Sequence, residues 1–218
     1  MKRLLLTLAL ASLAPLAMAD DDISKVNGAI STNAGTTYRD LDTVNGSIHL
    51  ASGVSARGVE TVNGSVHIED NVSARSVETV NGAIRSGRQL VLSGGLETVN
   101  GSIFVDRGSR IGGDVETVNG GIGLVGTQVQ GNIETVNGDI TVGVDSMIKG
   151  GIKVTRPSFS ISLTPPRKPR IIIGPNAVVE GNLVFEREVT LYVHDSARIG
   201  PVSGATVQRF SSERAPAD

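Results

Sequence analysis

The sequence predicts an all-β protein: a single-stranded parallel β-helix, or β-solenoid, with about 18 residues per coil and a triangular cross-section. The first observation is an internal repeat, E-T-V-N-G followed by one variable residue and then an apolar residue. The spacings between successive Asn-Gly pairs are 18, 18, 18, 19, 19 and 18 residues. The pairs begin at Asn27, Asn45, Asn63, Asn81, Asn100, Asn119 and Asn137. Such a period divides into three stretches of about six residues, each sufficient for a short strand and a bend.

The second observation is the alternation of apolar residues after each Asn-Gly pair. Val66 and Ile68 flank His67, and Ile103 and Val105 flank Phe104. This period of two predicts a strand whose apolar pair faces a core and whose central residue faces solvent. Each coil should therefore lie on its predecessor, with like residues about 4.8 Å apart in columns.

Two other repeat architectures fit less well. Asn-Gly is also a strong hairpin signal, but an antiparallel sheet would need two matched strands and a second turn between successive tips. The intervening segments instead carry a pattern of their own, as in residues 105–115 and 193–202. A solenoid of calcium-binding nonapeptides needs G-G-x-G-x-D every nine residues or so, and only fragments such as Gly112-Gly113-Asp114 occur.

Residues 1–19 have the features of a signal peptide. Lys2 and Arg3 precede an apolar run over residues 4–16, and Ala17-Met18-Ala19 forms a small-x-small cleavage site. The apolar run is too short to span a bilayer, so we expect no transmembrane segment. These features predict an exported protein, either periplasmic or secreted to the cell surface.

The remaining chain divides into a repeat domain and a tail. We expect one β-solenoid domain over residues 20–205, degenerate capping coils over residues 171–205 and a flexible C-terminal tail over residues 206–218. Residues 157–170 interrupt the repeat with several prolines and cations, which predicts an exposed loop. Arg167, Lys168 and Arg170 in this loop are candidate contacts to an anionic surface, such as an anionic glycan.

Composition narrows the function classes. With no cysteine, the chain has no disulfide framework and no thiolate chemistry. The formal charge of −2 argues against nucleic acid as a partner. With four Phe, two Tyr and no Trp, the core must consist of Val, Ile and Ala.

Two family resemblances follow from these motifs. The recurring E-T-V-N-G text resembles the putative-adhesin β-strand-repeat family of bacterial envelopes. Residues 109–115 and 177–183 (A-V-V-E-G-N-L) are similar to the coils of bactofilins, which form polymers. The first resemblance implies an adhesin-like envelope protein, and the second implies a self-assembling scaffold.

Columns of like residues are the candidate functional features of such a rod. One column is acidic, and repulsion within it calls for compensation. Arg39, Arg57 and Arg75 could flank its first part. Farther along, a cation such as Ca²⁺ could bridge the carboxylates, or the column could be a solvated face. The acidic column comprises Asp42, Glu60, Glu78, Glu97, Glu116 and Glu134, of which Glu97, Glu116 and Glu134 form the candidate cation site.

Next to the acids stand a threonine column and a valine column. Strict alternation would place the threonines inward and expose the valines as a sticky stripe. A bulge before the Asn-Gly corner could instead turn the valines inward, and we favour this second arrangement. The valine column comprises Val44, Val62, Val80, Val99, Val118 and Val136.

The asparagines predict a ladder of side-chain amides at one corner, formed by Asn45, Asn63, Asn81, Asn100, Asn119 and Asn137. His49 and His67 share an outward column, where they could hold a metal or stand simply as exposed histidines. We expect no resident metal or other cofactor.

No catalytic motif is present, so we expect no enzymatic activity. We expect an exported structural or binding protein of the bacterial envelope that acts through its repeated columns. Its partner would be an envelope or surface component, or a second copy of the chain. A self-assembling scaffold is the alternative, and a polysaccharide-active β-helix enzyme is a more remote one.

Overall fold

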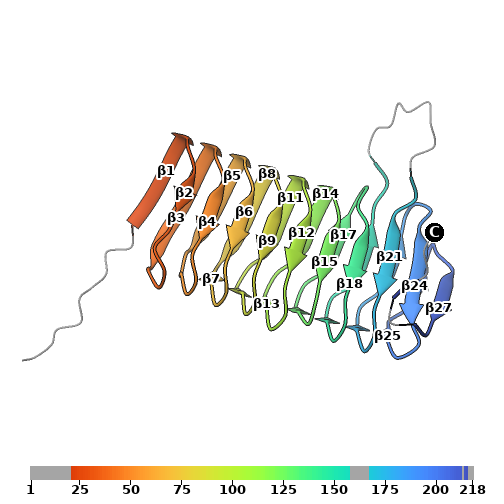
Figure 1. Cartoon of the computed structure of the whole chain (residues 1–218). Coiled ribbons are helices and arrows are strands. Elements are labelled where there is room, and N and C mark those ends of the chain that lie inside the picture. The colour runs from red at the N-terminus through yellow and green to blue at the C-terminus, as the bar shows by residue number, and fades with distance from the viewer. Residues whose placement is uncertain (1–20, 158–166, 213, 216–218) are drawn as a thin grey trace, which may run out of the picture.

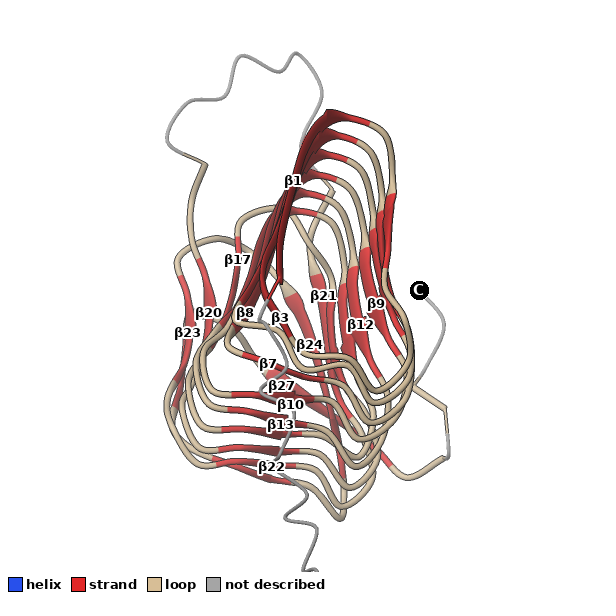
Figure 2. Ribbon diagram, turned by 90° about the vertical axis from the view of Figure 1, so that its left-hand side faces the viewer, coloured by secondary structure: helices blue, strands red, loops and turns tan. Residues whose placement is uncertain are grey.

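Successive coils lie directly on one another, because each strand pairs in parallel with the strand one repeat later. The computed structural model describes residues 21–157, 167–212, 214 and 215. These residues form three parallel sheets that run the length of a rod (Figure 1). Seen from the end of the rod, the sheets form the three walls of a triangular coil (Figure 2). The predicted β-solenoid is confirmed, and the predicted signal peptide lies outside the described residues.

The three sheets have distinct strand lengths. Sheet A contains β1 (Asp21–Asn27), β3 (Tyr38–Asn45), β5 (Gly58–Asn63), β8 (Ser76–Asn81), β11 (Leu96–Asn100), β14 (Val115–Asn119), β17 (Ile133–Thr135), β20 (Ile152–Val154), β23 (Leu183–Phe185) and β26 (Val202–Ser203). Sheet B contains β2 (Ile30–Ser31), β4 (Ile48–Leu50), β6 (Val66–Ile68), β9 (Ile84–Ser86), β12 (Ile103–Val105), β15 (Ile122–Leu124), β18 (Ile140–Val142), β21 (Arg170–Ile173), β24 (Thr190–His194) and β27 (Val207–Phe210). Sheet C contains β7 (Ser73–Ala74), β10 (Val91–Leu92), β13 (Arg110–Ile111), β16 (Gln128–Val129), β19 (Met147–Ile148), β22 (Val178–Val179) and β25 (Arg198–Ile199).

The core is a stack of aliphatic side chains, with one layer for each coil. Val77 from sheet A, Ile84 from sheet B and Leu92 from sheet C are all buried and belong to one continuous cluster. Aromatic residues enter the core chiefly at the C-terminal end, where Phe185 and Phe210 are buried. Small branched side chains suit this narrow interior, since every layer repeats the same cross-section.

The corner between sheets A and B needs glycine for a reason other than positive φ. In the part of the chain that is described, only Gly28 and Gly120 of the Asn-Gly corners have positive φ. At Gly82, a Cβ would instead overlap the carbonyl group of Gly64 in the preceding coil. The corners stack backbone on backbone, so the absence of a side chain is what the position requires.

Left-handed backbone occurs at the corner between sheets B and C, two residues before each sheet C strand from β7 to β22. Glycine occupies this place in some coils, with Gly53 at φ +73°. Other coils place a side-chain-bearing residue there, including Gln89 at φ +58°. The column comprises Gly35, Gly53, Asn71, Gln89, Gly108, Gly126, Asp145 and Asn176.

The C-terminal boundary of the solenoid differs from the predicted one. Residues 207–210 form β27, which pairs with β24 in parallel and buries Phe210 against the last coil. The repeat therefore continues past residue 205, into the segment expected to be a tail. Sequence alternation is lost there because only Val207 and Phe210 turn partly or wholly inward.

Candidate functional site

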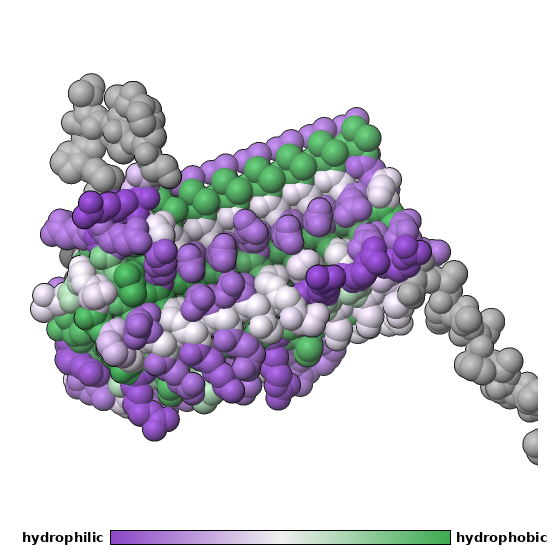
Figure 3. Space-filling view, turned by 180° about the vertical axis from the view of Figure 1, so that it is seen from behind, coloured by the Kyte–Doolittle hydropathy of each residue, from purple (hydrophilic) through white to green (hydrophobic). Residues whose placement is uncertain are grey.

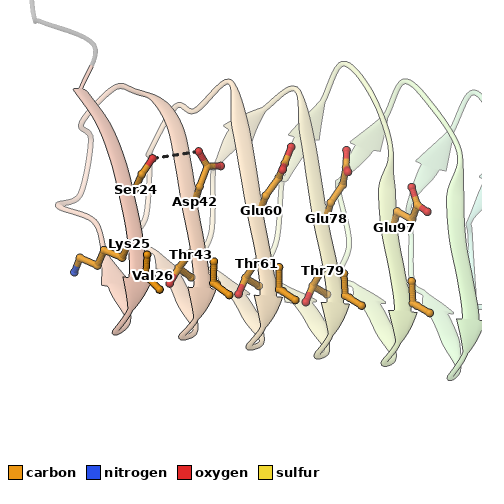
Figure 4. A pocket seen from close by; sticks show the side chains of 14 residues that line it. Ser24, Lys25, Val26, Asp42, Thr43, Glu60, Thr61, Glu78, Thr79 and Glu97 are labelled. Atoms are coloured by element: carbon orange, nitrogen blue, oxygen red, sulfur yellow. Dashed lines mark hydrogen bonds between the residues drawn. The ribbon is translucent and has the colours of Figure 1, made fainter.

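The outer face of sheet A repeats one row of side chains in coil after coil. Within each E-T-V-N sequence, the acid points outward, the threonine inward and the valine outward (Figure 4). The strands pair in register, so Glu60, Glu78 and Glu97 lie in one line. We call this surface the repeated face; it is defined by the acidic column and the valine column together.

Buried threonines hold the repeated face in place at the corner. Thr61 Oγ1 donates a hydrogen bond of 2.8 Å to the carbonyl oxygen of Gly46 in the preceding coil. The equivalent bonds of Thr43, Thr79, Thr98 and Thr117 are 2.9–3.1 Å long. Each bond satisfies a corner carbonyl that has no sheet partner on that side, which explains why a polar residue recurs in the core. The final member, Thr135, instead accepts a bond of 3.0 Å from the amide of Gly138.

The valines face solvent, contrary to the inward arrangement that we favoured. Val44, Val62, Val80 and Val118 have exposed fractions of 38–41%. The register between successive strands is regular through this part of sheet A, so no bulge turns the side chains inward. A hydrophobic stripe consequently runs along the rod beside a row of hydrophilic residues (Figure 3).

Burial and neighbouring charge raise the pKa of two carboxylates in the acidic column. Partial burial and the neighbouring carboxylates Glu78 and Asp42 raise the pKa of Glu60 above its ordinary value. Burial and the charges of Glu134 and Glu97 raise the pKa of Glu116 in the same way. The column begins at Ser24, whose hydroxyl lies 3.4 Å from Asp42, and it is continued by Lys153 beside Glu134.

Two of the three arginines predicted to flank this column, Arg39 and Arg57, pair with other acids. Arg57 Nε donates a hydrogen bond of 3.1 Å to Asp40, and this contact holds the pKa of Asp40 below its ordinary value. Arg39 lies 3.6 Å from Asp22. Asp22 and Asp40 precede Ser24 and Asp42 of the column by two residues and lie on the same face of sheet A. The two arginines contact these aspartates instead of the column. These two arginines therefore do not compensate the acidic column.

A shallow groove follows the repeated face along the first coils. Its volume is about 520 Å³, and it lies between the carboxylates and the valines (Figure 4). Its lining includes Asp42, Glu60, Glu78, Glu97, Val44, Val62, Val80 and Val99. A smaller hollow of about 110 Å³ continues past Glu97, Glu116 and Glu134. Within the described ranges, no three His, Asp or Glu side chains converge as metal ligands do, at this predicted cation site or elsewhere.

An asparagine ladder borders the repeated face at the corner. Each Nδ2 donates to the Oδ1 of the asparagine one coil earlier, at 2.9–3.0 Å, from Asn137 back to Asn27. At the C-terminal end, Arg187 Nη1 donates to Asn137 Oδ1 at 2.6 Å and to the carbonyl oxygen of Val136 at 3.0 Å. Arg187 lies outside the repeat, so the sequence pattern gave no signal for this role.

The candidate contact residues of the proline-rich segment have partners within the molecule. Arg167 lies 2.5 Å from Asp139, and Lys168 lies 2.6 Å from Glu188. The guanidinium of Arg170 stacks over the ring of Tyr192 at 5.1 Å. Residues 158–166 of this predicted loop lie outside the described part of the chain.

The two column histidines stack, with ring centroids 5.1 Å apart. His49 Nε2 also lies 3.0 Å from Glu69 Oε1. Ser52 donates to the other carboxylate oxygen through both its hydroxyl and its amide, and these bonds, with His49, lower the pKa of Glu69. Glu69 was not a sequence candidate, because its contact to His49 joins two neighbouring coils, 20 residues apart.

Comparison with known proteins gives no relative. The chain matches no protein-family model, no curated protein and no solved structure. The site must therefore be interpreted from its own geometry.

None of the residues that the structure describes forms a helix long and apolar enough to cross a lipid bilayer.

Proposed function

We propose that this protein is an exported, non-catalytic binding rod of the bacterial envelope, adhesin-like in that it attaches through its repeated face. The observation that carries the proposal is the recurrence of one exposed valine and one unpaired acid in successive coils of sheet A. A catalytic surface brings different groups together at one point. Here the same small set of groups recurs about every 4.8 Å along a line.

Repetition gives such a surface its strength. A single exposed valine and carboxylate offer little free energy to a partner, but a partner that spans several coils makes several contacts after one encounter. The effective concentration for each later contact is high, because the coils are rigidly spaced. The predicted signal peptide supports the envelope location, and the paired state of Arg167 and Lys168 shifts our emphasis from the proline-rich segment to sheet A.

The proposal can be tested by cosedimentation of the mature chain with isolated envelope fragments of its native host. A variant that carries Val62→Thr, Val80→Thr, Glu78→Gln and Glu97→Gln should bind several-fold less, because it loses both parts of the repeated face. A matched variant in another exposed position, Glu180→Gln, should bind as the original chain does. Equal binding by all three proteins would refute the proposal.

A self-assembling scaffold is a second candidate, and the open ends of the rod favour it. Among the strands that the structure describes, β1 pairs with β3 alone, and β26 ends sheet A at the other end. Unpaired strand edges can accept a strand from a second copy. Sedimentation velocity over a range of protein concentrations distinguishes the two: a scaffold forms growing polymers, whereas a binding rod remains a monomer.

A further inference from the structure

We propose that the groove of the repeated face binds a linear polyamine, with the amines along the acidic column and the methylene links along the valine stripe. This inference rests on the proposed function, since it assigns a ligand class to the same surface. Three features of the described residues carry it: unbalanced charge, an adjoining apolar strip and a fixed spacing.

The carboxylates that line the groove form no ion pair among the described residues. Glu60, Glu78 and Glu97 make no ion pair with any residue in the described ranges, and Asp42 is contacted only by the hydroxyl of Ser24. Lys25 lines the first coil of the groove, but its Nζ donates to the carbonyl oxygen of Ala29 at 2.7 Å, and Arg57 pairs with Asp40. An occupant that carries several positive charges would therefore remove the repulsion between the carboxylates without displacing an internal cation.

The other side of the groove is apolar. Val44, Val62 and Val80 line this side of the groove, with exposed fractions of 40–41%. A compact hydrated ion would leave these methyl groups in water, but an aliphatic chain between two amines would cover them. Burial of apolar surface contributes roughly 25 cal/mol per Å².

The spacing selects among cationic occupants. Carboxylates of neighbouring coils recur about every 4.8 Å. Bonds of about 1.5 Å place amines separated by three methylenes roughly 5 Å apart in an extended chain, close to one amine per coil. Side chains on one side of an extended peptide recur about every 6.8 Å. This spacing does not match the roughly 4.8 Å between coils, so a second basic side chain would not lie beside the next carboxylate. A second copy of the same face would oppose carboxylate to carboxylate.

Isothermal titration calorimetry at low ionic strength tests the assignment. The mature chain is titrated with a tetraamine that has three-methylene links and, separately, with one that has eight-methylene links. We expect the first to bind at least about 5-fold more tightly, because only its amines match the coil spacing. Equal affinity for the two, or no binding of either, would overturn the assignment; equal affinity would mean that general electrostatic attraction suffices.

Two variants then separate the charged and apolar contributions. Glu78→Gln with Glu97→Gln should weaken binding of the three-methylene tetraamine at least about 5-fold, and Val62→Thr with Val80→Thr about 3-fold. Glu180→Gln is the matched control and should leave the affinity unchanged. Circular dichroism melts confirm that each variant is folded, and an unchanged affinity in both folded double variants contradicts the proposal.

The outcome is independent of the test for envelope attachment. If the tetraamine does not bind while the same substitutions reduce cosedimentation with envelope fragments, the polyamine assignment is wrong and the proposed function stands. If neither result depends on the repeated face, both proposals are wrong.

Discussion

Arg187 Nη1 donates a hydrogen bond of 2.6 Å to Asn137 Oδ1, so a guanidinium ends the ladder of side-chain amides. Arg187 comes from the turn between β23 and β24, and it also donates to the carbonyl oxygen of Arg167 at 3.2 Å. It thereby links the last Asn-Gly corner, the segment before β21 and the turn before β24. The chain departs from its repeat between β20 and β21, and Arg187 fixes the position at which the repeat resumes.

Arg187→Ala should therefore destabilise the C-terminal coils by about 1–3 kcal/mol, because it removes charge-assisted hydrogen bonds. The loss should appear as faster proteolytic cleavage between residues 155 and 169. Arg198→Ala is the matched control, since Arg198 is exposed and its side chain forms no hydrogen bond or ion pair within the described residues. Equal cleavage of the two variants would show that Arg187 does not hold this junction.

The asparagine ladder predicts an effect that depends on position. Asn81 donates one side-chain bond and accepts another, whereas Asn27 makes only one. Asn81→Ala should cost about 1–2 kcal/mol in the free energy of unfolding, and Asn27→Ala about half of that. Chemical denaturation with matched m-values measures both. A loss at Asn27 equal to that at Asn81 would mean that corner geometry, and not the ladder, determines the effect.

The two glycine corners should respond differently to alanine. Gly82→Ala should prevent stable folding or cost more than about 4 kcal/mol, because the new Cβ overlaps the backbone of the preceding coil. Gly53→Ala should cost only about 1 kcal/mol, since space is available and the left-handed backbone alone opposes the change. Thermal melts of the two variants suffice, and a mild effect at Gly82 would contradict the observed stacking of the corners.

The same left-handed corner offers a stabilising substitution. Gln89 has φ +58°, a conformation that costs a residue with a Cβ roughly 1 kcal/mol. Gln89→Gly should therefore raise the free energy of unfolding by several tenths of a kcal/mol, after allowance for the greater freedom of glycine in the unfolded chain. A decrease in stability would show that contacts of the Gln89 side chain outweigh the backbone strain.

Glu116 predicts a pH dependence with a definite sign. Its raised pKa means that the folded state disfavours the charged form, so the charge lowers stability as the pH rises through the folded pKa. Glu116→Gln should therefore stabilise the protein at pH 7 by up to about 1 kcal/mol. The gain should vanish well below pH 4.5, the ordinary pKa of a glutamate side chain. Denaturation at both pH values measures the difference, with Glu180→Gln as the control, and a gain that persists in acid would contradict the charge argument.

Repeat spacing and alternation were sufficient to predict the solenoid, because a backbone that returns to the same place after about 18 residues gives both. Strict alternation also gave inward threonines, but we favoured the other arrangement. The valines were harder to place. An apolar column suggests a core, but Thr79 points inward and bonds the corner carbonyl of Gly64, so alternation places Val80 outside.

Features outside the repeat could not be predicted. Arg187 acts across 50 residues of sequence, and no periodic position marks it. The partners of Arg39 and Arg57 depended on side-chain reach, since Asp22 and Asp40 lie on the same face as the acidic column. β27 was missed because its alternation is incomplete.

The most direct test of the account is to disable the repeated face one coil at a time and measure attachment to envelope fragments after each step. The pairs Glu60→Gln with Val62→Thr, Glu78→Gln with Val80→Thr, and Glu97→Gln with Val99→Thr are combined in turn. If attachment is multivalent, the logarithm of the affinity falls in nearly equal steps as coils are lost. Complete loss from one particular coil, or unchanged attachment after all three, would contradict it.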